Sequence, residues 1–193
     1  MRPQKTLDED VLAGLTEVFQ SKGYEAASLQ DLARATGLKK ASLYHRFPGG
    51  KKQMAEAVLG HLSEWVEEHV FRVIHHTAES PQIRLQKAID QIKVLYDNGK
   101  NTCIFRALSM ETGISLFRLQ IEKGMNEWLK AFEAIGEELK LDSKTAKDYA
   151  YQSMIDIQGS LILTSTLDDP EIFEDALKRI TNRYLNDNRQ EMQ

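Results

Sequence analysis

Residues 28–47 read SLQDLARATGLKKASLYHRF. Ser28 followed three residues later by Asp31 is typical of a helix N-terminus, and Gly37 ends that helix after about two turns. A short second helix follows over 39–47, because a Pro-Gly-Gly run stops it. Two short helices joined by a turn that contains glycine are the sequence form of a helix-turn-helix.

The second of these helices divides into an anchoring side and an outward side. Leu43 and Phe47 are expected to fix it to the core, together with Leu38. The residues left to face outward are Lys40, Ala41, Ser42, Tyr44 and His45. A lysine can donate a hydrogen bond to guanine, a serine can hydrogen-bond to several bases, and an alanine methyl can contact the thymine methyl. The alternative is a plain helical hairpin with a solvated basic face.

Charge along the chain is uneven. Residues 1–52 hold nine Lys and Arg against six Asp and Glu, whereas the rest of the chain holds 16 against 23. Between Leu32 and Ala55 there are six basic residues and no acidic one. Lys51 and Lys52 open the next helix, where the helix dipole also favours a phosphate. The net charge of −4 therefore hides a basic head on an acidic body.

Apolar residues recur at helical spacing nearly everywhere, and the predicted fold class is all-α, with about nine helices. We expect a helix-turn-helix DNA-binding domain over 1–52 and a helical ligand-binding and dimerisation domain over 53–193. The expected helices cover 7–22, 28–36, 39–47, 51–76, 81–97, 103–113, 114–140, 142–166 and 168–186.

The stretch Thr36–Pro48, with Phe47-Pro48-Gly49-Gly50-Lys51 after it, resembles the TetR family of repressors over residues 7 to about 60. The longer Pro-Gly-Gly turn is similar to the LmrA-like branch. The resemblance implies a homodimer whose first three helices bind operator DNA, while the rest binds a small-molecule effector and the second subunit. Lys39 and Lys52 depart from the usual family residues, and both add positive charge near the DNA backbone.

Carried over by position, the resemblance implies ten DNA-binding residues. Gln30, Lys40, Ala41, Ser42 and His45 would approach base edges, and Ser28, Tyr44 and Lys51 would hold phosphates. Lys39 and Lys52 complete the predicted interface.

The acidic body is rich in aromatic and Met residues. The resemblance implies a ligand pocket among them, although each is also explained as ordinary core. The candidate pocket residues are Trp65, Tyr96, Phe105, Met110, Phe117, Met125, Trp128, Tyr151 and Met154.

The last two expected helices are apolar over more than one stripe, so each must bury two sides. Two such helices from each subunit make a two-fold, four-helix dimer interface. The candidate interface residues are Met154, Gln158, Leu161, Ile162, Phe173, Leu177, Ile180 and Tyr184.

Other classes of protein are weakly supported. No metal is expected, because His75 and His76 are adjacent and the chain has a single cysteine, Cys103. No cofactor or enzymatic motif is found, and no apolar run is long enough for a membrane span. We expect a cytoplasmic repressor that a small, largely apolar effector releases from an inverted-repeat operator. An activator, or a DNA-binding factor without a ligand, remains the alternative.

Overall fold

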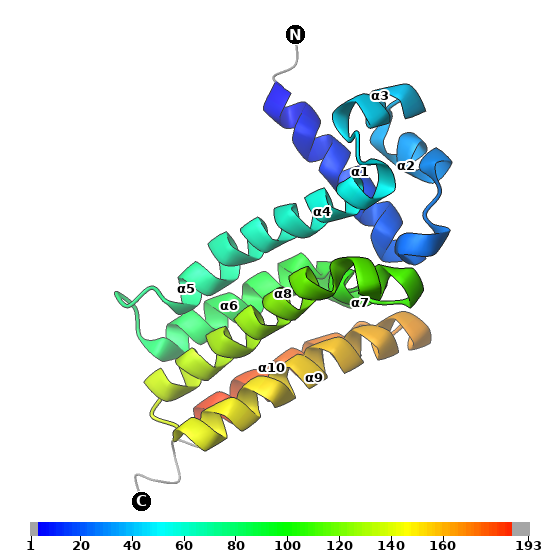
Figure 1. The fold of residues 1–193 in the computed structure, drawn as a ribbon. Helices are drawn as coiled ribbons and strands as arrows, with labels where there is room; N and C mark the ends of the chain where they lie inside the picture. The colour runs from blue at the N-terminus through cyan, green and yellow to red at the C-terminus, as the bar shows by residue number, and fades with distance from the viewer. Residues whose placement is uncertain (1–3, 187–193) are drawn as a thin grey trace, which may run out of the picture. The chain divides into compact units, whose positions relative to one another are not determined.

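The computed structural model describes residues 4–186, and every regular element in that range is helical (Figure 1). The elements are α1 (Gln4–Ala26), α2 (Leu29–Thr36), α3 (Lys40–Arg46), α4 (Gly50–Val66), the π-helix η1 (Glu67–Phe71), α5 (Arg72–Ile74), α6 (Pro81–Leu95), the 3₁₀ turn η2 (Asp97–Gly99), α7 (Ile104–Leu108), α8 (Glu111–Glu138), α9 (Ser143–Leu167) and α10 (Glu171–Asn186).

The predicted all-α class is confirmed. Helices α4, η1 and α5 follow one another without a break, so they count as one long helix. With that count, the part of the chain that the structure describes holds nine helices besides the 3₁₀ turn. None of the described helices is both long enough and apolar enough to cross a bilayer.

The chain folds as two compact units, each discontinuous in sequence. The first unit contains the described residues up to Glu64 together with Cys103–Glu122. The second contains Trp65–Thr102 and the described residues from Lys123 onward. Helix α8 thus contributes its first turns to one unit and its remaining turns to the other.

The first unit is built around α1. Val11, Leu15 and Phe19, spaced at helical intervals along α1, are all buried. Leu32 of α2 and Leu43 of α3 are completely buried as well. Figure 1 shows α2 and α3 beside α1, in the blue and cyan part of the ribbon. The buried apolar residues of α1, α2 and α3 therefore form one shared core.

Helix α7 completes this unit by packing against the end of α1. At Gly23, where φ is 72°, an added Cβ would lie 3.2 Å from the carbonyl oxygen of Ala107. The ring of Tyr24 meets that of Phe117 edge to face, with centroids 5.1 Å apart. Residues 103–122 are therefore part of the core that supports α1.

The second unit has α9 and α10 lying side by side over α6 and the later turns of α8 (Figure 1). Phe173, Ile180 and Tyr184 of α10 are completely buried. The Tyr184 hydroxyl donates to the carbonyl oxygen of Phe132, and burial raises the pKa of this phenol. Gly136 allows close packing, because a Cβ there would lie 3.1 Å from the Ala146 Cβ.

Several expected helices differ from those observed, and the one expected over 7–22 continues past Gly23 to Ala26. The helix expected over 103–113 ends at Leu108, and α8 begins at Glu111. Gly113 is not a helix stop. It lies inside α8, where a Cβ would come within 2.6 Å of the Leu108 carbonyl oxygen. The long helix expected over 51–76 contains the π-turn Glu67–Phe71, which its apolar spacing did not predict.

Candidate nucleic-acid interface

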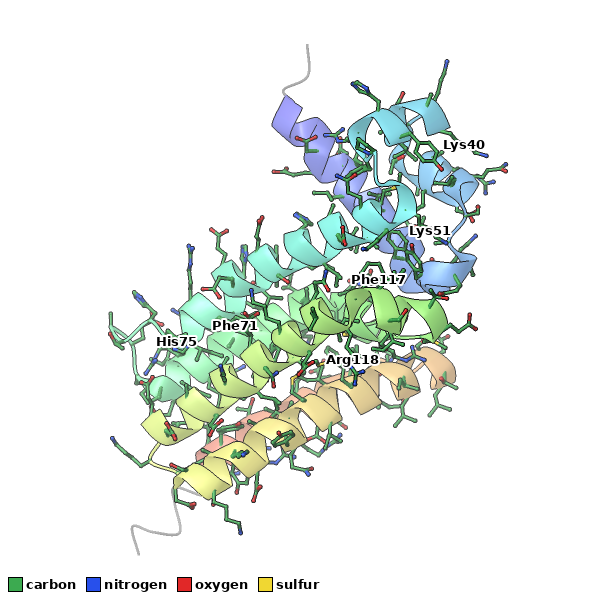
Figure 2. The ribbon with its side chains drawn as sticks, in the orientation of Figure 1. Lys40, Lys51, Phe71, His75, Phe117 and Arg118 are labelled. Carbon is green, nitrogen blue, oxygen red and sulfur yellow. The ribbon has the colours of Figure 1, made fainter. Side chains whose placement is uncertain are left out.

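Helix α3 presents a continuous outward face. Leu43 is completely buried and Phe47 is 8% exposed, so these two side chains fix the helix to the unit. The exposed residues at and after its start are Lys39, Lys40, Ala41, Ser42, Tyr44 and His45. Figure 2 labels Lys40 on this face. The structure therefore brings together six of the ten predicted DNA-binding residues.

The turn before α3 has the geometry that its sequence predicts. Gly37 has φ 67° and lies in the left-handed region. Its amide donates to the carbonyl oxygen of Arg34 over 3.3 Å. A glycine adopts this conformation without the steric cost that a Cβ brings. The turn fixes the direction in which α3 leaves α2.

Helices α1 and α2 pack closely at Gly14. An added Cβ at Gly14 would lie 2.6 Å from the carbonyl oxygen of Ala35 and 3.1 Å from the amide nitrogen of Thr36. Both neighbours are backbone atoms, so neither can rotate away. The sequence indicates the helix-turn-helix but does not reveal this contact, because Gly14 looks like an ordinary helix position.

Ser28 starts α2 through a complete capping box. The Asp31 amide donates to the Ser28 Oγ over 3.1 Å, and the Ser28 hydroxyl donates to the Asp31 carboxylate over 2.6 Å. Lys22 of α1 pairs with the same carboxylate at 2.9 Å. The Lys22 ammonium and then the Ser28 hydroxyl lower the pKa of Asp31 to about 2. Gln30, beside them, is exposed.

Lys51 and Lys52 are adjacent but lie in different surroundings. The Lys51 ammonium donates to the carbonyl oxygens of Tyr24 and Glu25, over 2.8 and 3.2 Å. Figure 2 labels Lys51. The Lys52 side chain is 51% exposed and pairs loosely with Glu56, at 3.7 Å. Phosphate contact by either residue stays a prediction, but only Lys52 has an ammonium that is largely in solvent.

Arg46 is a residue of this surface that the sequence analysis left out of the site. It ends α3 and forms an ion pair with Asp8 of α1. The pair connects the last turn of the candidate recognition helix to the first helix of the unit. Arg46 belongs to the acid-free basic run, and that charge pattern was the one sequence signal that could have singled it out.

The nine candidate pocket residues are divided between the two units. Phe105, Met110 and Phe117 belong to the first, and the other six belong to the second. Trp128 is buried, with its ring near those of Phe71 and Phe132. Met110 and Tyr151 are 60% and 49% exposed. Membership of one ligand pocket stays a prediction for all nine.

The other candidate pocket residues of the second unit differ in their ring contacts and burial. Tyr96 is buried and meets Phe173 edge to face. The Trp65 ring stacks on that of His69, with centroids 4.4 Å apart. Met125 is half-buried, and Met154 is 9% exposed. These contacts are the kind that an ordinary protein core also makes.

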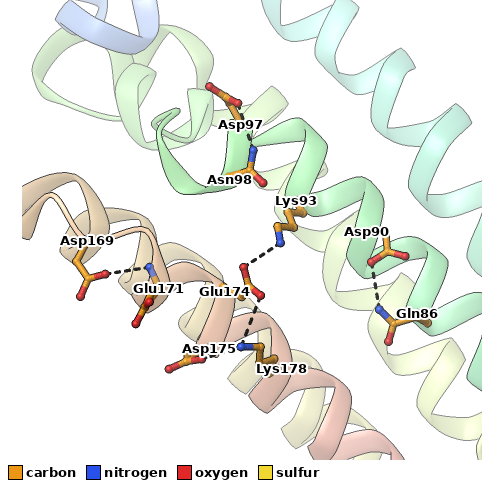
Figure 3. Close-up of polar contacts among 10 residues, drawn as sticks. All are labelled: Gln86, Asp90, Lys93, Asp97, Asn98, Asp169, Glu171, Glu174, Asp175 and Lys178. Carbon is orange, nitrogen blue, oxygen red and sulfur yellow. Dashed lines mark hydrogen bonds and ion pairs between the residues drawn. The ribbon is translucent and has the colours of Figure 1, made fainter.

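The second unit has a surface groove of about 450 Å³ between α6 and α10. Its floor includes Ile89 and Leu177, and its edge carries Lys93, Glu174 and Lys178. Figure 3 shows Glu174 between the two lysines, with Lys93 at 2.9 Å and Lys178 at 3.5 Å. None of the candidate pocket residues lines this groove.

Most candidate dimer residues are already buried inside a single chain. The buried ones are Met154, Leu161, Phe173, Leu177, Ile180 and Tyr184. Gln158 is half-buried, and Ile162 is 42% exposed. Helix α9 exposes further large apolar side chains, at Tyr151, Ile155, Leu163 and Leu167. The dimer interface stays a prediction, and these exposed residues are the ones that a second copy would cover.

Among the described residues, no group of three or more His, Cys, Asp or Glu side chains is placed to hold a metal ion. Cys103 is buried in the first unit.

Comparisons with known proteins agree with the N-terminal geometry. Residues 11–58 match the family described as bacterial regulatory proteins, tetR family. The chain is 25% identical to the HTH-type transcriptional regulator LmrA of Bacillus subtilis over 164 residues, which cover 82% of this chain and 86% of LmrA. This similarity extends well beyond the helix-turn-helix.

Solved structures share the whole fold. A TetR transcriptional regulator from Legionella pneumophila superposes with a TM-score of 0.77 at 22% identity, covering 93% of this chain and 96% of that one. A TetR-family regulator from Agrobacterium tumefaciens gives 0.78 at 16% identity, covering 93% and 97%. The matched residues 11–58 and the exposed face of α3 indicate a helix-turn-helix DNA-binding domain like that of the tetR family, and the solved TetR-type regulators share the fold of this chain.

Proposed function

We propose that this regulator is a cytoplasmic repressor that binds an inverted-repeat operator as a homodimer and leaves it when a small, largely apolar effector binds. The exposed face of α3 is the observation that carries the proposal. It places Lys39, Lys40, Ser42, Tyr44 and His45 together on a helix that two buried side chains anchor, in a stretch without acidic residues. Occupied operator DNA then excludes the polymerase.

Lys40 and Tyr44 have different tasks in this proposal. Lys40 lies at the start of α3 and is exposed, so its ammonium reaches a base edge in the major groove. Tyr44 is 46% exposed, and its ring lies beside Gly50, where an added Cβ would be 3.5 Å from the Tyr44 Cε1. That support directs its hydroxyl to a phosphate oxygen, which positions the helix without reading sequence.

A homodimer supplies the symmetry that an inverted repeat requires. Two recognition helices about 34–36 Å apart fit successive major grooves. Support comes from the apolar residues that α9 leaves exposed, among them Ile155 at 58% and Ile162 at 42%. A surface of this kind on one helix favours burial against a second copy of itself.

The effector is proposed to be largely apolar because aromatic rings dominate the candidate lining. Six of the nine candidate pocket residues are aromatic, namely Trp65, Tyr96, Phe105, Phe117, Trp128 and Tyr151. Such an effector releases the operator only by its higher affinity for the DNA-free state.

The test is a titration of the protein against genomic fragments, including its own upstream region, at two salt concentrations. We expect tight binding to one inverted repeat, and weaker binding to random DNA. Lys40→Ala should reduce discrimination at one base position by about 1–3 kcal/mol, whereas Tyr44→Phe should weaken binding to every sequence about equally. Equal effects of both variants on operator and random DNA would contradict the assignment of Lys40 to a base.

The same operator separates the alternatives. Transcription in vitro from a template that carries it should fall when the protein is added, and a rise would instead identify an activator. Operator binding that no apolar compound releases would indicate a DNA-binding factor without a ligand.

A further inference from the structure

Lys51 has an environment unlike that of a phosphate contact. Its Nζ donates to the carbonyl oxygen of Tyr24 over 2.8 Å and to that of Glu25 over 3.2 Å. The same ammonium lies 4.5 Å from the centroid of the Tyr24 ring. An ammonium has three donors and no acceptor, and two carbonyls and a ring face occupy all three.

The carbonyl end of α1 needs such a cation. The last carbonyls of a helix lack partners within that helix, and Gly23, with φ 72°, interrupts the helical conformation of α1 directly before Tyr24 and Glu25. Helix α1 has no basic residue in its own last turn, and Glu25 adds a negative charge there. Lys51, at the start of α4, supplies from a distant part of the sequence what α1 lacks.

This contact also determines where the end of α3 lies. Gly50, directly before Lys51, donates its amide to the Phe47 carbonyl oxygen over 2.8 Å and has φ 66°. A Cβ added at Gly50 would lie 3.5 Å from Cε1 of the Tyr44 ring. The chain from Phe47 to Gly50 is therefore a tight turn, with α3 before it and Lys51, whose ammonium binds α1, directly after it.

We propose that Lys51 is a positioning residue, whose ammonium ties the turn after the recognition helix to the carbonyl end of α1, and that the adjacent Lys52 is the one that binds DNA phosphate. The inference rests on the proposed operator binding and replaces the expectation that Lys51 holds a phosphate. Lys52 is its natural control, because it has the same charge and the neighbouring position but a 51% exposed side chain.

Salt dependence distinguishes the two lysines. Each phosphate that a protein neutralises adds about 0.9 to the slope of log affinity against log salt. Lys52→Met should lower the slope by about that amount and weaken operator and random DNA equally. Lys51→Met should leave the slope and random-DNA binding unchanged, yet weaken operator binding about tenfold, which is the contribution of one well-placed base contact. Lys51→Arg should restore most of this loss.

The wild-type protein offers a measurement that does not depend on folding of a variant. Methylene protons of Lys51 beside the Tyr24 ring should have upfield NMR shifts, and these shifts should persist in the operator complex. A loss of slope in Lys51→Met equal to that in Lys52→Met, an unchanged operator affinity in Lys51→Met, or disappearance of the upfield shifts on DNA would each overturn the inference. If the wild-type protein shows no preference for an operator over random DNA, it is the proposed function that fails.

Discussion

Glycines at three positions of the first unit have three different roles. Gly14 allows a close approach of backbones, Gly37 provides a left-handed turn, and Gly60 has open space within 4 Å of the point where a Cβ would stand. The sequence makes the role of Gly37 clear, since it separates two short helical patterns. The role of Gly14 depends on α2, which is distant in sequence, so no local pattern could predict it.

A series of alanine substitutions tests these roles. Gly14→Ala should destabilise the protein by about 2–3 kcal/mol, because the new Cβ meets fixed backbone atoms. Gly37→Ala should cost about 1–2 kcal/mol from backbone strain alone. Gly60→Ala, in the open and inside α4, should stabilise by about 0.5–1 kcal/mol. Urea unfolding gives all three values, and a neutral Gly14→Ala would contradict the close packing of α1 on α2.

The ionisation of the Asp31 carboxyl makes the stability of the first unit depend on pH in the acidic range. Its pKa is lowered from 3.8 to about 2 in the folded protein, so the ionised form is the stabilising one. The stabilisation is complete above pH 3.8 and is lost as the pH falls towards about 2. Thermal unfolding of the wild type and Asp31→Asn should therefore differ at neutral pH and converge over this acidic window. A difference that stays constant with pH would show that the carboxylate is not involved.

At the level of helices, Arg84 connects three segments of the second unit. It is 2% exposed and pairs with Glu138 at the end of α8. It also donates to the carbonyl oxygen of Ile74, which ends α5, and to that of Glu79 over 3.1 Å. The Arg84 guanidinium lowers the pKa of the Glu138 carboxyl. One cation thus joins the end of α5, the loop before α6 and the end of α8.

Arg84→Met should cost about 3 kcal/mol, since it removes one member of a partly buried ion pair and leaves two carbonyls without a donor. Lys87 on the same helix provides the control, because its side chain is 52% exposed and it pairs with Glu79. Lys87→Met should cost about 0–1 kcal/mol, as exposed ion pairs do. Chemical denaturation measures the free energy of unfolding of both variants. An equal decrease in the two would show that Arg84 does not have this role.

Most helices could be predicted from apolar spacing and end signals, and the differences have local causes. The cap formed by Ser28 and the turn at Gly37 could be predicted from the sequence, because their partners lie within a few residues. The π-turn Glu67–Phe71 was not, because one extra residue barely changes the spacing of apolar positions over a long helix. The contacts of Lys51 were hidden because its partners lie 26 and 27 residues earlier in the chain.

Across the whole chain, the basic head could be recognised despite the total charge of −4, because the basic residues cluster in sequence. Burial in the second unit was harder to predict. The apolar arcs of α9 and α10 indicated that two sides are covered, but not which side faces α6 and α8. Phe173, Ile180 and Tyr184 turned out to be completely buried within one chain. Ile155 was not among the candidates, although it is more exposed than Ile162, which was.

The exposed face of α9 gives a test of assembly. Ile155→Glu should convert a dimer to a monomer in light scattering and weaken binding to the inverted repeat, because it places a charge in an apolar interface. Val94→Glu is the control, since Val94 on α6 is 62% exposed and Ile155 is 58% exposed. An Ile155→Glu protein that remains dimeric would locate the interface elsewhere.

The first unit includes residues 103–122 as well as the stretch that ends at Glu64, and this order matters while the protein is being made. A bacterial ribosome adds about 5–20 residues each second, so the helix-turn-helix leaves the exit tunnel seconds before α7 exists. Until then, the surface of α1 around Gly23 lacks its partner. The nascent head therefore completes its core only late in translation, and a chimaera that borrows this head must also carry α7 and the first turns of α8.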